Sequence, residues 1–194
     1  QMRLSTALSL IVVTIMSGCT MSQVAVRGAM PLMDGGFEAM NRENDLELAR
    51  AAIPASVKML EGMAIGDPTN AQLHIYAAQG LYGYTYGFVE LEDPIRAVTL
   101  YTRCLSHAAE ALKIEGLDVG LEHTALDGLQ AALAETDSRH VPGLFWAASC
   151  MAKRVDMSRT DPEAIAQLAR SAALMQRVVT LDETYYYGGP HLFF

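Results

Sequence analysis

Residues 80–90 read GLYGYTYGFVE, and the structure of this stretch decides the fold class. Its aromatic residues occupy positions 82, 84, 86 and 88, the alternation of a half-buried strand, and tyrosine and phenylalanine favour strands. Three glycines among them weaken both a strand and a helix. The flanks favour a helix, because Asn70 can cap one and Asp93-Pro94 is a suitable start for the next. The strand remains the alternative.

On a helix, successive side chains are rotated by about 100°, which sorts the same residues into three groups. The glycines share one face, and the rings form two stripes. Each glycine costs about 1 kcal/mol relative to alanine in a helix, so close helix–helix packing on the glycine face is expected to offset that cost. The glycine face is Gly80, Gly83 and Gly87, one stripe is Tyr84 and Phe88, and the other is Tyr82 and Tyr86.

Helix boundary signals recur along the chain, whereas no other stretch has a convincing strand pattern. Asn44 with Glu47 reads as a capping box, and Asp161-Pro162 repeats the cap-and-proline pattern of Asp93-Pro94. Short connections predict antiparallel neighbours. We expect helices near 31–42, 45–65, 70–90, 94–114, 123–136, 142–156 and 162–180, with a last one beginning near 184.

The helices also carry a weak repeat pattern. Ala97, Tyr101 and Cys104 have the small, large, small spacing of the second helix in a tetratricopeptide repeat. The predicted fold class is therefore all-α, with antiparallel helical hairpins arranged as degenerate tetratricopeptide-like repeats in an α-α superhelix.

The N-terminus predicts export and lipidation. Arg3 precedes an apolar run too short to span a bilayer comfortably, and the run ends in Met16-Ser17-Gly18-Cys19, which resembles a bacterial lipobox. We expect a lipoprotein signal peptide at 1–18, a lipidated tether at 19–30 with lipid on Cys19, and a helical-repeat domain at 31–194 that is truncated at its C-terminus. By the sorting rule for such lipoproteins, Thr20 rather than an aspartate after the cysteine implies attachment to the outer membrane. An ordinary secretory signal with a chance cysteine is the alternative.

The remaining composition excludes several classes of function. The net charge is −8 with no basic cluster, so nucleic acid is not an expected partner. The five histidines form no metal-binding spacing, and nucleophile, phosphate-loop and dinucleotide motifs are absent from the sequence. We expect no enzyme activity, metal or cofactor. Cys104 and Cys150 lie in apolar helical contexts; two separately buried thiols are favoured over a disulfide.

Five blocks of the sequence resemble the T-component family of TRAP transporters, over roughly residues 27–194. The blocks are NDLELARAAIPASVKMLEGM, AAQGLYGYTYGFVE, DPIRAVTLYTRCLSHAAEAL, VPGLFWAASC and YYYGGPHLFF. The resemblance implies a periplasmic lipoprotein with degenerate tetratricopeptide-like hairpins that associates with a TRAP substrate-binding subunit. It also implies a homotrimer with a hydrophobic pore through each protomer.

Two functions follow as hypotheses. The first is a lipoprotein of a TRAP uptake system that docks the substrate-binding subunit and binds a hydrophobic or carboxylate-bearing solute. The second is a tetratricopeptide-type scaffold lipoprotein for cell-envelope assembly. An aromatic ligand surface competes with a tyrosine-rich core whose hydroxyls reach the surface. The candidate surface is Tyr82, Tyr84, Tyr86, Phe88, Phe145, Trp146 and Tyr185, with Arg96 and Arg103 as candidate electrostatic contacts.

Overall fold

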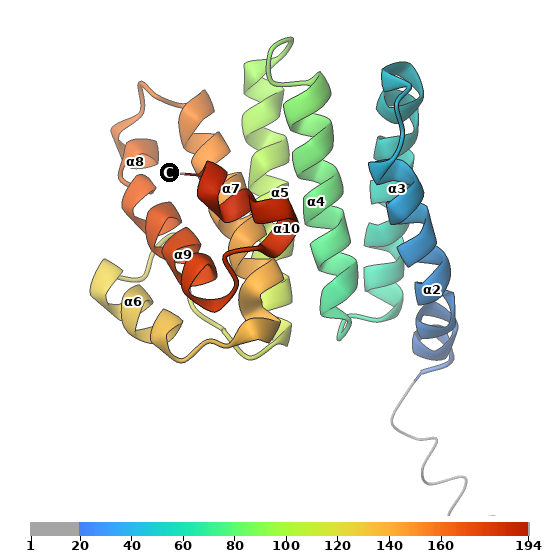
Figure 1. Cartoon of the computed structure of the whole chain (residues 1–194), viewed down its shortest axis with the longest axis horizontal. Helices are drawn as coiled ribbons and strands as arrows, with labels where there is room; N and C mark the ends of the chain where they lie inside the picture. The colour runs from blue at the N-terminus through green and yellow to red at the C-terminus, as the bar shows by residue number, and fades with distance from the viewer. Residues whose placement is uncertain (1–19, 194) are drawn as a thin grey trace, which may run out of the picture.

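The structure is a computed structural model that describes residues 20–193. The predicted signal peptide and Cys19 lie outside the described residues, so cleavage and lipidation stay predictions. The described part is all-α and contains no strand, which confirms the predicted class (Figure 1). Its elements are α2 (Met21–Asn41), α3 (Leu46–Gly66), α4 (Ala71–Phe88), α5 (Pro94–Ile114), α6 (Leu126–Ala134), η2 (Ser138–His140), α7 (Val141–Met157), α8 (Pro162–Ile165), α9 (Leu168–Leu181), α10 (Tyr185–Gly188) and η3 (Gly189–Leu192).

The helices form a row in which neighbours in sequence are mostly neighbours in space. Contacts run from α3 to α4, α4 to α5, α5 to α7 and α7 to α9 (Figure 1). Helix α2 packs on α3 at one end of the row, and α6 packs on α9 at the other. The red C-terminal segment, α10 and η3, lies across the front of the row (Figure 1). The antiparallel hairpins are therefore present, while their classification as tetratricopeptide-like repeats stays a prediction.

The opening stretch is helical through Phe88, so the strand alternative is wrong. Helix α4 ends where the Val89 N–H donates to the Thr85 carbonyl oxygen, 3.0 Å away. The close packing predicted for the glycine face occurs only at Gly80, where an added Cβ would lie 2.7 Å from Val57 Cγ2 of α3. A Cβ at Gly83 or Gly87 would meet no atom within 4 Å, so the packing role predicted for these two glycines is wrong.

Helix α2 begins ten residues before the predicted helix at 31–42, so residues 21–30 are not an irregular tether. Thr20 and Gln23 form a capping box that starts the helix at Met21. The helix is held to the turn after α3 by an ion pair between Arg27 and the buried Asp67, 2.7 Å apart. Apolar side chains of α2, including Val26 and Met30, pack against α3 and α4. Residues 21–30 therefore belong to the folded body.

Other predicted boundaries also shift. Asp45, rather than Asn44, caps α3. The helix predicted at 162–180 is interrupted by a turn between α8 and α9. The helix predicted from 184 is a single turn, because Tyr186 and Tyr187 have left-handed φ angles of 47° and 61°.

The core lies between α4, α5, α7 and α9, with Tyr101 and Trp146 among its largest buried side chains. Cys104 of α5 and Cys150 of α7 are joined by a disulfide with a Cα–Cα distance of 5.9 Å. The expectation of two separate thiols is therefore wrong. The pairing depends on the contact between α5 and α7, which are not consecutive helices, so neither cysteine's local sequence reveals it. Between residues 20 and 193, no helix combines the length and apolarity required to cross a bilayer.

Candidate functional site

Aromatic rings of α4 and α7 meet on the face covered by the C-terminal segment. Tyr82 and Tyr86, one turn apart on α4, are stacked with their centroids 6.1 Å apart. Tyr82 also contacts the ring of Trp146 on α7 at 5.5 Å, and Phe145 meets Trp146 edge-on at 5.0 Å. Phe145 and Trp146 are buried, whereas Tyr86 is 57% exposed. The cluster therefore runs from the core to the surface.

The C-terminal segment adds a second set of rings. Tyr186 lies edge-on to Trp146 at 4.9 Å, and Tyr185 packs against Phe145 at 5.2 Å. Gly189 allows the segment to come this close, because an added Cβ would lie 2.9 Å from Phe145 Cζ. The Tyr186 hydroxyl accepts a hydrogen bond of 3.3 Å from the Gln79 amide on α4. The segment thus bridges α7 and α4.

Between these rings lies a cavity of about 480 Å³, which we call the aromatic groove. Two further cavities share Gln79 and Tyr186 with it. The apolar crevice, about 230 Å³, reaches between α2, α3 and α4; the mouth, about 380 Å³, opens between α2, α4 and the C-terminal segment. The groove is lined by Gln79, Tyr82, Gly83, Tyr86, Phe145, Trp146, Ser149, Met175, Tyr186, Tyr187, Gly189, Leu192 and Phe193.

Charge is scarce in these cavities. The groove and the crevice have no charged lining residue among the described residues, and the mouth has two, Asp34 and Glu38. Lys153 lies 5.1 Å from the Tyr86 ring centroid but is bonded to Glu90 and Asp156. Burial alone would lower the pKa of Lys153, but its two carboxylate partners raise it overall, so the ammonium stays charged and paired.

Burial keeps the hydroxyls of Tyr82, Tyr185 and Tyr186 uncharged at neutral pH by raising the pKa of each. The pKa of Tyr185 rises to about 12. Burial and a hydrogen bond to Asp34 likewise raise the pKa of Tyr76, in the mouth, to about 12. The arrangement suits an apolar or aromatic ligand held by stacking and a few hydrogen bonds.

The structure brings together part of the predicted surface. Tyr82, Tyr86, Phe145 and Trp146 line the groove, and Tyr185 packs behind Phe145.

Tyr84 and Phe88 do not reach the groove. They lie next to the guanidinium groups of Arg96 and Arg50, at 5.7 Å and 5.9 Å from the ring centroids. Arg103 pairs with Glu61 on α3, away from these rings.

Several lining residues escaped the sequence-based prediction. Tyr186 and Tyr187 were not among the predicted surface residues, although both belong to the same YYY run as Tyr185. Gln79 carries no pattern that marks it. The α2 side of the crevice, including Met33 and Phe37, was missed because the contact of α2 with α4 is not visible in a local pattern.

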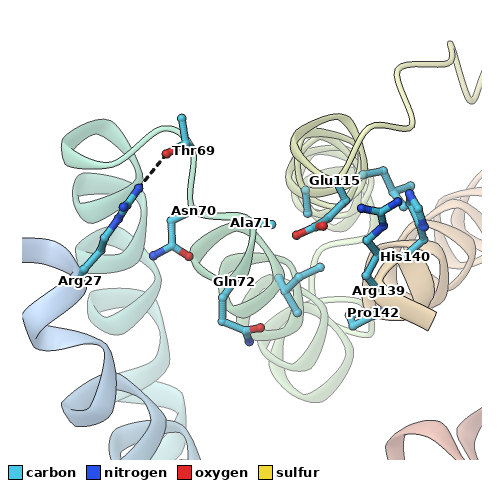
Figure 2. Close-up of a pocket in the computed structure, with 13 residues that line it drawn as sticks. Arg27, Thr69, Asn70, Ala71, Gln72, Glu115, Arg139, His140 and Pro142 are labelled. Carbon is cyan, nitrogen blue, oxygen red and sulfur yellow. Dashed lines mark hydrogen bonds between the residues drawn. The ribbon is translucent and has the colours of Figure 1, made fainter. Parts of the chain in front are cut away.

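A separate polar cavity of about 400 Å³ lies where the start of α4, the end of α5 and the start of α7 come together. Figure 2 shows Arg27 and Thr69 on one wall, joined by a 3.1 Å hydrogen bond, and Arg139 and His140 on the opposite wall. Arg27 pairs with Asp67, and Arg139 pairs with a neighbouring aspartate. Its cations are therefore already partnered. Across the described residues, no group of three or more metal-ligating side chains could hold a metal ion.

Two comparisons bear on identity. The family model described as TRAP transporter T-component matches residues 42–194. No curated protein is similar enough to the chain to count as a match. The matched range includes α3 to η3 and excludes α2.

Proposed function

The chain belongs to the TRAP transporter T-component family, and from this premise we propose that it docks the substrate-binding subunit of a TRAP transporter and binds a hydrophobic solute in the aromatic groove. Membership makes it a component of a TRAP transport system. A periplasmic location, a lipid on Cys19, attachment to the outer membrane and assembly into a homotrimer belong to the same proposal.

The observation that carries the proposal is the aromatic groove itself. A cavity of about 480 Å³ lined by stacked rings falls within the size range of small-molecule sites, roughly 300–1,000 Å³. Of the two solute classes expected from the sequence, the lining favours the hydrophobic one. A carboxylate would meet no basic lining residue among the described residues and would lie near Asp34 and Glu38 in the mouth.

A scaffold for cell-envelope assembly is the second candidate, and the same groove would then hold a peptide from a partner. The two candidates differ in what fills the groove and in which protein associates. The TRAP reading is favoured by the family match, whereas nothing in the described residues selects an assembly partner.

Ligand binding is tested directly because the chain contains one tryptophan, Trp146, which lines the groove. Titration of the whole chain with 1-decanol should change the Trp146 emission saturably. Gly83→Leu places a side chain where groove and crevice meet and should weaken binding at least tenfold. Gly87→Leu is the matched control, since Gly87 is on the same helix and lines none of the three cavities. Equal loss in both variants would contradict the assigned site.

Docking is tested by isothermal titration of the chain with the TRAP substrate-binding subunit from the same genome. Saturable association is expected, and its absence for both proteins in folded form would remove the docking half of the proposal. The anchor is separable: Cys19→Ala should move the protein from the membrane fraction to the soluble fraction. Persistence of that variant in the membrane fraction would refute lipidation as the main attachment.

A further inference from the structure

The three cavities share Gln79 and Tyr186 as lining residues, and the crevice and the mouth differ in polarity. The crevice is apolar, with Met33, Met40 and Leu60 among its walls. The mouth contains aromatic rings and carboxylates. A molecule that occupies both has an apolar body and a head group exposed to the mouth.

The mouth has the composition of a site for an organic cation. Phe37 and Tyr76 stack with centroids 4.0 Å apart on one side, and Tyr186 and Tyr187 meet at 5.4 Å on the other. Ring faces attract ammonium groups within about 6 Å of the centroid. Lys153 already uses the face of Tyr86 in this way at 5.1 Å.

The charges in the mouth agree with this. Asp34 accepts a 2.6 Å hydrogen bond from the Tyr76 hydroxyl, and among the described residues no basic side chain pairs with it. Glu38 pairs with Arg42 one turn along α2. No Lys or Arg lines the crevice, the groove or the mouth within the described residues. The whole chain is also acidic, with a net charge of −8.

We propose that the crevice and the mouth, which share Phe37, Asn41, Gln79 and Tyr186 as lining residues, together bind an amphipathic organic cation, with its alkyl body in the apolar crevice and a quaternary ammonium or protonated amine in the mouth. This inference rests on the proposed ligand-binding function: it extends the ligand site from the groove to the two neighbouring cavities and names the class of the ligand. It depends on α2, which contributes Met33, Asp34, Phe37 and Met40 and lies outside residues 42–194.

The test compares three probes with the same chain length: decyltrimethylammonium and decanoate below their micelle concentrations, and 1-decanol below its solubility limit. Binding to the whole chain is measured by isothermal titration calorimetry at constant ionic strength, because Trp146 lines the groove but neither the crevice nor the mouth. The cation should bind at least tenfold more tightly than decanoate, with decanol between them. Shortening the alkyl chain of the cation should lower its affinity about fourfold per methylene, the value expected for burial of an alkyl chain.

Asp34→Asn tests the head-group contact, since asparagine can still accept the Tyr76 hydrogen bond. In this variant the affinity for decyltrimethylammonium should fall about three- to fivefold, and the affinity for decanol should stay the same within twofold. Glu135→Gln is the control. It changes the net charge by the same amount at an exposed residue that directly follows α6. Glu135→Gln should change the affinity for neither probe.

The outcomes separate this inference from the proposed function. If decanol binds but decanoate binds as tightly as the cation or more tightly, the cation inference is wrong and the hydrophobic site stands. The same follows if Asp34→Asn leaves the cation unaffected. If none of the three probes binds, ligand binding in these cavities is wrong, and the cation inference falls with it.

Discussion

Substituting alanine at two glycines of α4 provides the sharpest test of the helix packing. Gly80 and Gly83 lie three residues apart on the face that the sequence assigned to close packing. A Cβ at Gly80 would lie 2.7 Å from Val57 Cγ2, whereas a Cβ at Gly83 would have no neighbour within 4 Å. Alanine should therefore stabilise the protein at position 83 but not at position 80.

The magnitudes follow from two contributions. Replacing glycine by alanine within a helix stabilises it by about 1 kcal/mol at either position. At Gly80 the clash adds an overpacking cost of about 1–3 kcal/mol, because Val57 is buried and a valine on a helix has one strongly preferred rotamer. Gly83→Ala should stabilise the protein by about 1 kcal/mol, and Gly80→Ala should range from neutral to about 2 kcal/mol destabilising.

The free energy of unfolding of each variant is measured by urea denaturation followed by far-ultraviolet circular dichroism, and Tm by thermal unfolding. The two Tm values should differ by at least about 2–4 °C, the shift expected per kcal/mol for a chain of this size. In the double variant Gly80→Ala/Val57→Ala the clash is removed. Its loss of stability should therefore be smaller than the sum of the losses in the two single variants. Equal shifts for Gly80→Ala and Gly83→Ala would refute the close contact at Gly80.

Three further predictions concern the helix contacts. Replacing Cys104 and Cys150 together by alanine should lower the free energy of unfolding by about 4 kcal/mol, the loop-entropy value for a separation of 46 residues, measured by urea denaturation. Arg27→Ala should cost about 1–3 kcal/mol, because it removes a charged partner of the buried Asp67, and should speed hydrogen exchange in α2 specifically. Burial alone would raise the pKa of Glu61, but bonds from three basic side chains lower it to about 2, so its contribution is present above its ordinary pKa of 4.5 and lost as pH falls toward 2. Glu61→Gln should remove about 1–2 kcal/mol of that acid dependence, after allowance for solvent screening.

The fold class was predictable because local signals and the global fold agree along most of the chain. Asp93 caps α5 through the Arg96 N–H, and Pro94 occupies the first turn, as the sequence predicts. In agreement with those boundaries, residues 80–88 of the GLYGYTYGFVE stretch are helical despite the alternating rings. Helical geometry also separates Tyr82 and Tyr86 from Tyr84 correctly.

The site was only partly predictable because its parts are joined by tertiary contacts. Periodicity yields two aromatic stripes, but only the packing of α7 and the C-terminal segment shows that Tyr82 and Tyr86 face the groove. The start of α2 was missed, since Thr20 and Gln23 are a weak signal next to residues that resemble a linker. The partnership of Cys104 with Cys150 required knowing which helices are neighbours.

The strongest departure from sequence rules occurs where the three cavities meet. Left-handed backbone is uncommon for residues other than glycine and costs about 1–3 kcal/mol, yet Tyr186 and Tyr187 adopt it in succession although Gly188 and Gly189 follow directly. The Tyr186 conformation is accompanied by ring contacts to Trp146 and a hydrogen bond from Gln79 that help to offset this cost. A regular helix here would direct the Tyr186 ring elsewhere and leave the groove, the crevice and the mouth without their common wall. Such local conflicts are expected at functional sites, which supports placing the ligand at this residue rather than along the whole aromatic surface.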